Sequence, residues 1–267
     1  MKNLWNLYKA NAKRGTFKAE GNTIYIYDVI VGDEFEAEFL GGVAPKPFID
    51  TLKGMSGDVH LRINSPGGDV FGANAMAQAM REYQGGKIVA HVDGVAASAA
   101  SVLAVTADET VMAPGSMLMI HNAWTMSIGN RNDLLETAAL LEKIDGMLAQ
   151  TYATKSGGKA SEFAAMMDAE TWFTPEEAVA SGLATSVAEP KPKAAPASMW
   201  DLSAFANAPK AAAPLVTRTT TVTQCTEIET ETVEVLSGDP ATAPEDSIDR
   251  EIEDRKRRLA AALLKTG

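Results

Sequence analysis

The stretch Val92-Asp93-Gly94-Val95-Ala96-Ala97-Ser98-Ala99-Ala100-Ser101 decides how this chain folds and where its chemistry lies. The run from Lys87 to Val92 predicts a strand, and Asp93-Gly94 predicts a tight turn at its end. Small residues and then Val102-Leu103-Ala104-Val105 predict a buried helix that begins near Ser98. A serine there has its hydroxyl at a helix N-terminus, where free N–H groups and the helix dipole favour negative charge. These residues alone fit a nucleophile or, more commonly, a simple helix cap.

Two other strand ends carry groups that a serine hydrolase needs. The stretch Ile63-Asn64-Ser65-Pro66-Gly67-Gly68 closes an alternating strand, and Met119-Ile120-His121-Asn122 closes a second apolar run. A serine, a histidine and a Gly-Gly turn at strand ends can supply a nucleophile, a general base and an oxyanion site. Together, the three stretches favour catalysis over capping at Ser98.

These motifs resemble those of the Clp protease proteolytic subunit, ClpP. The matching stretches are INSPGG (63–68), G-x-A-A-S (94–98), M-I-H (119–121) and F-T-P-E-E-A-x-x-x-G-L (173–183), in the same order and with matching spacing. The resemblance covers roughly residues 24–187. It implies an α/β fold of the ClpP/crotonase type, made of repeated ββα units with a long handle helix and followed here by a largely disordered C-terminal extension.

The resemblance also assigns catalytic roles. It makes Ser98 the nucleophile, because the family serine directly follows Ala-Ala, and it makes His121 the general base. Ser101 lies one helical turn further on and is the internal competitor for the nucleophile. The backbone N–H groups of Gly68 and Ala99 would then form the oxyanion hole.

The motifs leave two candidates for the acid of the triad. Aligning Thr174 and Glu176-Glu177-Ala178 with the family motif places Glu170 where the family has an aspartate, and Asp168 is the alternative. A glutamate can also orient a histidine in such triads. The substrate would bind as an added strand. The resemblance implies that it contacts Gly67, Gly68, Asp69, Val70, Ala123, Trp124, Thr125 and Met126.

Composition and charge limit the class of protein. The chain has 267 residues, 46% hydrophobic and 22% charged, which is ordinary for a soluble globular protein. Its net charge of −11 argues against a nucleic-acid partner. A single cysteine, Cys225, excludes an internal disulfide and favours a reducing compartment. Because no apolar run could span a membrane and no signal core is evident, we expect a cytoplasmic protein without a membrane partner. The motifs require no metal and no cofactor.

Changes in composition divide the chain into four segments. We expect an N-terminal arm at 1–21, a protease domain at 22–188, a disordered linker at 189–246 and a terminal helix at 247–267. Strands are predicted at 24–31, 59–63, 87–92, 109–113, 117–120 and 183–187, with a further edge strand at 33–39. Helices are predicted at 45–55, 70–83, 133–155 and 159–167, with another from Pro175. His60 and His91 lie inside strands without a matching motif and are interpreted as structural.

The leading hypothesis is a serine endopeptidase of ClpP type. The long tail and a candidate glutamate in the triad differ from the housekeeping enzyme, and such ClpP-like proteins resemble the head-maturation (prohead) proteases of tailed phages. This reading implies a homo-oligomeric ring, a polypeptide substrate such as a phage scaffold or capsid protein, and location within a procapsid in the host cytoplasm. Two alternatives stay open: an ATP-dependent degradation subunit that works with an unfoldase ATPase, and a crotonase-like enzyme acting on acyl-CoA.

Overall fold

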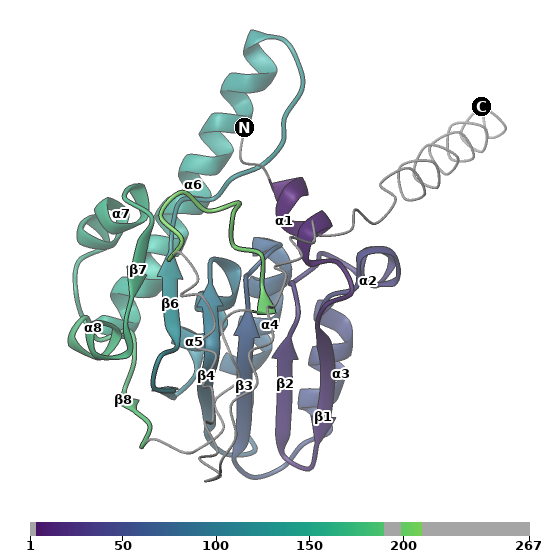
Figure 1. The fold of residues 1–267 in the computed structure, drawn as a ribbon, viewed down its shortest axis with the longest axis vertical. Coiled ribbons are helices and arrows are strands. Elements are labelled where there is room, and N and C mark those ends of the chain that lie inside the picture. The colour runs from purple at the N-terminus through teal and green to yellow at the C-terminus, as the bar shows by residue number, and fades with distance from the viewer. Residues whose placement is uncertain (1–3, 190–198, 210–267) are drawn as a thin grey trace, which may run out of the picture. The chain divides into compact units, whose positions relative to one another are not determined.

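One β-sheet organises the described part of this computed structural model, residues 4–189 and 199–209 (Figure 1). Its main path runs in the order β1-β2-β3-β4-β5-β8, and β6 and β7 branch from β4. The strands are β1 (Thr16–Glu20), β2 (Thr23–Tyr27), β3 (Val59–Ser65), β4 (Ile88–Ala97), β5 (Glu109–Met112), β6 (Met117–Ile120), β7 (Thr171–Phe173) and β8 (Ser186–Val187). All pairs are parallel except β1–β2 and β6–β7.

Helices connect these strands, and most of them cover one face of the sheet (Figure 1). They are α1 (Leu4–Asn11), α2 (Glu34–Leu40), α3 (Pro45–Lys53), α4 (Val70–Arg81), α5 (Ala99–Thr106), α6 (Arg131–Ser156), α7 (Ala160–Asp168) and α8 (Pro175–Ala180). The main core lies between the sheet and helices α3 to α8, and its fully buried side chains include Ile63, Met76, Leu103 and Tyr152. The parallel strands with connecting helices confirm the predicted α/β class.

Local signals account for several helix ends. Asn130 and Asp133 form a capping box at the start of α6, and Gly157 ends that helix in the left-handed conformation at φ 74°. Thr174 and Glu177 form a second capping box at the start of α8. The long helix predicted at 133–155 and the helix start at Pro175 are therefore confirmed.

The structure corrects two local predictions. The edge strand expected at 33–39 is helix α2, because the Asp33 side chain caps it by accepting a hydrogen bond from the Glu36 N–H at 2.8 Å. Its apolar residues, Phe35 and Phe39, are four apart and their rings lie 4.7 Å from each other. The turn expected at Asp93-Gly94 is also wrong, since β4 continues to Ala97 and its last residues pair with β6.

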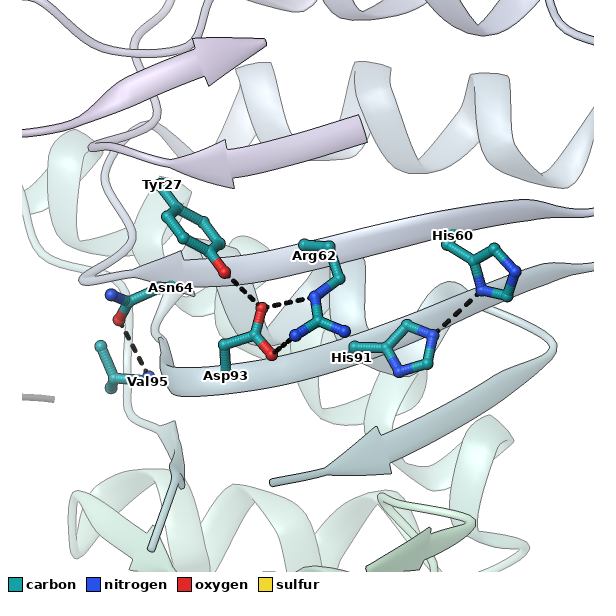
Figure 2. A network of polar contacts seen from close by, with 7 residues as sticks. All are labelled: Tyr27, His60, Arg62, Asn64, His91, Asp93 and Val95. Carbon is teal, nitrogen blue, oxygen red and sulfur yellow. Dashed lines mark hydrogen bonds and ion pairs between the residues drawn. The ribbon is translucent and has the colours of Figure 1, made fainter. Parts of the chain in front are cut away.

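The open face of the sheet, opposite the helices, carries a polar network (Figure 2). Asp93 accepts hydrogen bonds from Tyr27 Oη and Arg62 Nε at 2.5 and 2.7 Å. His60 Nδ1 and His91 Nε2 lie 3.1 Å apart on the neighbouring strands β3 and β4. The network compensates the burial of the Asp93 carboxylate, so we assign it a structural role.

Two segments outside the expected protease domain contribute to this open face as well. Residues 1–21, expected to be an arm, include α1 and the strand β1. Residues 199–209 lie within the expected linker, yet Trp200 and Phe205 are buried against the carboxyl ends of β4 and β6. The expectation of a linker therefore does not hold for this segment. The helix predicted at 247–267 lies outside the described residues. Among the described residues, no helix is long and apolar enough to cross a membrane.

Candidate active site

Ser98 lies at the sharp turn where β4 ends and α5 begins. Its φ and ψ are 53° and −125°, a conformation that residues other than glycine rarely adopt and that costs about 1–3 kcal/mol. The Ser98 N–H donates to the Met119 carbonyl at 3.0 Å, which ties the turn to β6. Backbone strain of this kind gathers at functional sites, so the geometry singles out Ser98.

His121 follows β6 and meets Ser98 directly. The parallel register of β4 and β6 sets Ala97 opposite Met119, so both strands deliver their next residues to the same edge of the sheet. His121 Nε2 lies 2.8 Å from Ser98 Oγ. This distance is that of a hydrogen bond through which a histidine can remove a serine proton.

Ser101, the competing serine, makes its hydrogen bonds to groups other than His121. Its hydroxyl donates to the Ser98 carbonyl at 2.6 Å and lies 2.8 Å from the Tyr152 hydroxyl. The residue is fully buried. Its surroundings are those of a helix-packing residue, whereas Ser98 faces a histidine.

The two predicted oxyanion donors border the same site. Gly68 and Ala99 lie beside Ser98 in the pocket lining, and no hydrogen bond between described residues uses either N–H. The glycines permit a close approach of three backbone segments. A Cβ on Gly67 would lie 2.5 Å from the Ala97 carbonyl oxygen, and one on Gly68 would lie 2.0 Å from that of Ile30.

A pocket of about 150 Å³ opens beside Ser98 and His121. Six of the eight predicted substrate-contact residues line it, namely Gly68, Asp69, Val70, Ala123, Trp124 and Thr125, whereas Gly67 and Met126 do not. Helix α6 supplies the side that sequence reasoning missed, with Thr137, Leu140, Leu141, Ile144, Leu148 and Tyr152. The apolar stripe of α6 was visible in the sequence, but the surface that it faces was not.

The two candidate acids have different partners. Asp168 accepts a hydrogen bond from Asn122 Nδ2 at 2.7 Å. Glu170 follows α7 with a φ of 48°, and its carboxylate accepts hydrogen bonds from the N–H groups of Ala206 and Asn207 at 2.7 and 2.5 Å. In the described part of the chain, no hydrogen bond joins either carboxylate to His121.

The surroundings of His121 favour its neutral form. The rings of Trp124 and Phe205 pack edge-on against the imidazole, with centroids 5.3 and 5.4 Å away. This burial lowers the pKa of His121 to about 4, and the opposing effect of the Glu170 charge, which raises the pKa, is smaller. Glu170 rather than Asp168 is thus the carboxylate whose charge acts on the histidine.

A strained serine at a strand-to-helix turn, hydrogen-bonded to a histidine beside two free N–H groups, defines a site of the serine hydrolase class. The Clp protease family model matches residues 29–191, and the chain therefore belongs to the Clp protease family. Within residues 4–189 and 199–209, no group of three or more His, Cys, Asp or Glu side chains could hold a metal ion.

Curated relatives agree with this family. The "ATP-dependent Clp protease proteolytic subunit 1" of Leifsonia xyli is 26% identical over 161 residues, which cover 60% of this chain and 81% of that protein. The "ATP-dependent Clp protease proteolytic subunit 2" of Tropheryma whipplei is 26% identical over 156 residues, 58% of this chain and 86% of the relative. The corresponding protein of Bacteroides fragilis is 30% identical over 132 residues, 49% and 63% of the two chains.

Proposed function

We propose that this chain is a serine endopeptidase that hydrolyses peptide bonds with Ser98, His121 and Glu170 as nucleophile, general base and acid. The hydrogen-bond distance of 2.8 Å between Ser98 Oγ and His121 Nε2 carries the proposal. The family match supports it over the crotonase-like alternative, since acyl-CoA chemistry does not need this pair.

The geometry accommodates both halves of peptide hydrolysis. Ser98 Oγ attacks the scissile carbonyl while His121 Nε2 takes its proton, and the N–H groups of Gly68 and Ala99 stabilise the oxyanion. His121 then gives the proton to the departing amine, leaving an acyl group on Ser98. Water, deprotonated by the same nitrogen, hydrolyses this ester and restores both residues.

The pocket beside Ser98 supports a preference for apolar side chains in the substrate. Its lining is mostly apolar, aliphatic and aromatic together, and Val70, Leu141, Ile144 and Leu148 come from two helices. An acidic side chain would lose its hydration there without gaining a cationic partner, since no lysine or arginine of the described residues lines the pocket. The backbones at Gly68–Val70 and Ala123–Met126 flank the site, and we propose that the substrate pairs with them as an added strand.

Exposed apolar residues support a homo-oligomeric ring. Six of them belong to α6 and the loop before it: Met126, Ile128, Leu134, Leu135, Leu140 and Met147. Ile128 is 100% exposed, and such a cluster on a free surface marks an interaction site. A ring that encloses the active sites would admit extended polypeptides and exclude folded ones, unless an unfoldase ATPase delivers them.

Within this class we propose the role of a prohead maturation protease, acting on phage scaffold or capsid protein inside a procapsid. The long Ala-, Pro- and Thr-rich sequence after residue 189 supports it, because an extension on a protease suits an enzyme that is packaged with its substrate. The names of the two relatives, ATP-dependent Clp protease proteolytic subunits, favour the alternative of an ATP-dependent degradation subunit.

Intact mass spectrometry of the purified chain separates these two roles. A maturation protease meets its own tails at high effective concentration, so wild type should trim itself within Lys191–Thr223 without ATP, while Ser98→Ala stays full length. Most of this range lies outside the described residues. A wild type that cleaves peptides yet keeps its full mass would contradict the maturation role and leave the peptidase assignment standing.

A further inference from the structure

The 199–209 segment is docked on the open face of the sheet by specific contacts. Trp200 and Phe205 are 5% and 2% exposed, in a cluster with Leu7, Val95, Ala97 and Met119. The Trp200 indole N–H donates to Asn64 Oδ1 at 3.1 Å. The Asn11 side chain exchanges two hydrogen bonds with the backbone of Asp201, at 2.8 and 2.9 Å. Two aromatic anchors and three polar contacts hold the segment near the carboxyl ends of β4 and β6.

The end of this segment occupies the proposed triad acid. The Ala206 N–H donates to Glu170 Oε2 at 2.7 Å, and the Asn207 N–H donates to Oε1 at 2.5 Å. The Asn207 side chain also donates to the Ala169 carbonyl at 2.8 Å. Both carboxylate oxygens therefore accept charge-assisted hydrogen bonds from main chain that lies more than thirty residues away in the sequence.

The same segment covers the histidine but spares the substrate pocket. The Phe205 ring lies 5.4 Å from the imidazole of His121 and 5.5 Å from the ring of Trp124. No residue of the segment lines the pocket beside Ser98, and the Ser98–His121 hydrogen bond is intact. The segment thus contacts the base and the acid of the triad without blocking access to the nucleophile.

A triad acid acts by accepting a hydrogen bond from the Nδ1–H of the histidine, which fixes the tautomer and stabilises the imidazolium. In the described chain, Glu170 makes no such bond to His121, and its oxygens instead accept from the N–H groups of Ala206 and Asn207 and, at 3.3 Å, from the Trp172 indole N–H. We infer that the 199–209 segment is an autoinhibitory element, which keeps Glu170 from pairing with His121 until the segment undocks. This inference rests on the proposed function, with Glu170 as the triad acid.

The packing of the segment allows the inhibition to be reversed. The segment belongs to a small cluster separate from the main core, so it can open locally while the sheet stays folded. Undocking removes Phe205 from the imidazole and releases Glu170 from the N–H groups of Ala206 and Asn207, which leaves only the Trp172 indole N–H at 3.3 Å on Oε1. Each change raises the pKa of His121 from its value of about 4, since water returns and a carboxylate becomes available. His121 then becomes a stronger base.

Single substitutions in the full-length chain test the inference. Asn207→Pro removes the N–H donor to Glu170 Oε1 and leaves the Ala206 donor and the aromatic anchors in place, whereas Phe205→Ala removes an anchor. Ala206→Ser is the matched control, because the Ala206 side chain is exposed and the substitution keeps the N–H that donates to Glu170 Oε2. We expect kcat/KM for a short apolar peptide to rise about tenfold or more in the first two variants. The control should keep the wild-type value.

A second readout separates autoinhibition from loosened packing. In a chain labelled at the histidine Cε1 carbon, the NMR signal of His121 should titrate near pH 4 in wild type and at a distinctly higher pH in Asn207→Pro. If Phe205→Ala does not fold by circular dichroism, Asn207→Pro alone decides. Equal or lower activity with an unchanged His121 titration overturns the inference. If no variant cleaves peptide and a fluorophosphonate leaves Ser98 unlabelled, the proposed function itself has failed.

Discussion

The main core and the small cluster under the 199–209 segment lie on opposite faces of the same strand. In β4, Ala96 packs into the main core while Val95 and Ala97 pack into the small cluster. The main core is built from residues 24–184 and holds Ser98 and His121 in contact. The small cluster joins Leu7 to Trp200 and Phe205, from distant parts of the chain, and its segment binds Glu170. The proposed nucleophile and base are thus positioned by the continuous main core, whereas the proposed acid, Glu170, is bound by a segment that we infer can undock.

The largest effect should come from the pair that the main core positions. Ser98→Ala and His121→Ala should each lower kcat/KM on a peptide substrate by several orders of magnitude, because triad members act as a unit. Circular dichroism should show both variants folded, since neither side chain fills the core. Activity in Ser98→Ala close to that of wild type would rule out this assignment.

The next effect distinguishes the two carboxylates. Glu170→Gln should lower kcat more than Asp168→Asn does, because only Glu170 acts on the charge of His121. The neutral amide would leave the tautomer of the imidazole unfixed once the segment undocks. Steady-state kinetics of the two variants check this ranking, and the reverse order would transfer the role of acid to Asp168.

A stability comparison sharpens the difference between the two regions. Leu103→Ala in the main core should reduce the free energy of unfolding by about 2–5 kcal/mol. Phe205→Ala should reduce it less, because the small cluster opens before the domain unfolds. Urea denaturation followed by circular dichroism measures both values. A loss in Phe205→Ala as large as that in Leu103→Ala would show that the two regions unfold together.

The smallest effect on catalysis should come from the second serine. Ser101→Ala should keep measurable peptidase activity, because its hydroxyl binds the Ser98 carbonyl and the Tyr152 hydroxyl rather than a histidine. A modest loss of stability is expected from the unpaired Tyr152 hydroxyl. Kinetics on a peptide substrate, measured side by side for Ser101→Ala and Ser98→Ala, check this difference. Loss of all activity in Ser101→Ala would contradict it.

Sequence patterns predicted most of the region that positions Ser98 and His121. Alternation located β3, β5 and β6, and helical spacing with capping residues located α4, α6 and α8. Helix α2 was missed because the alternation of acidic and apolar residues in 33–39 resembles a strand, while Asp33 acts as a helix cap. The turn at Asp93-Gly94 was misplaced because pairing with β6, a long-range contact, extends β4 to Ala97.

The small cluster and the pocket wall could not be predicted in the same way. Trp200 and Phe205 stand in an Ala- and Pro-rich sequence whose average composition indicates a linker, and their partners, such as Asn64 for Trp200 and His121 for Phe205, are far away in the sequence. The two aromatic residues were the one local signal of a docked segment. Similarly, the spacing of apolar residues in α6 predicted a buried stripe, but only the fold shows that Leu141 and Ile144 face the Ser98 pocket.

Covalent labelling of the full-length protein tests the central claim most directly. A fluorophosphonate reacts with a serine only when a base and an oxyanion site activate it. After incubation, intact mass and peptide mapping should show a single adduct on Ser98 in wild type and none in Ser98→Ala or His121→Ala. An adduct on Ser101, or equal labelling of the His121→Ala variant, would contradict the assignment of Ser98 and His121 as the nucleophile and base.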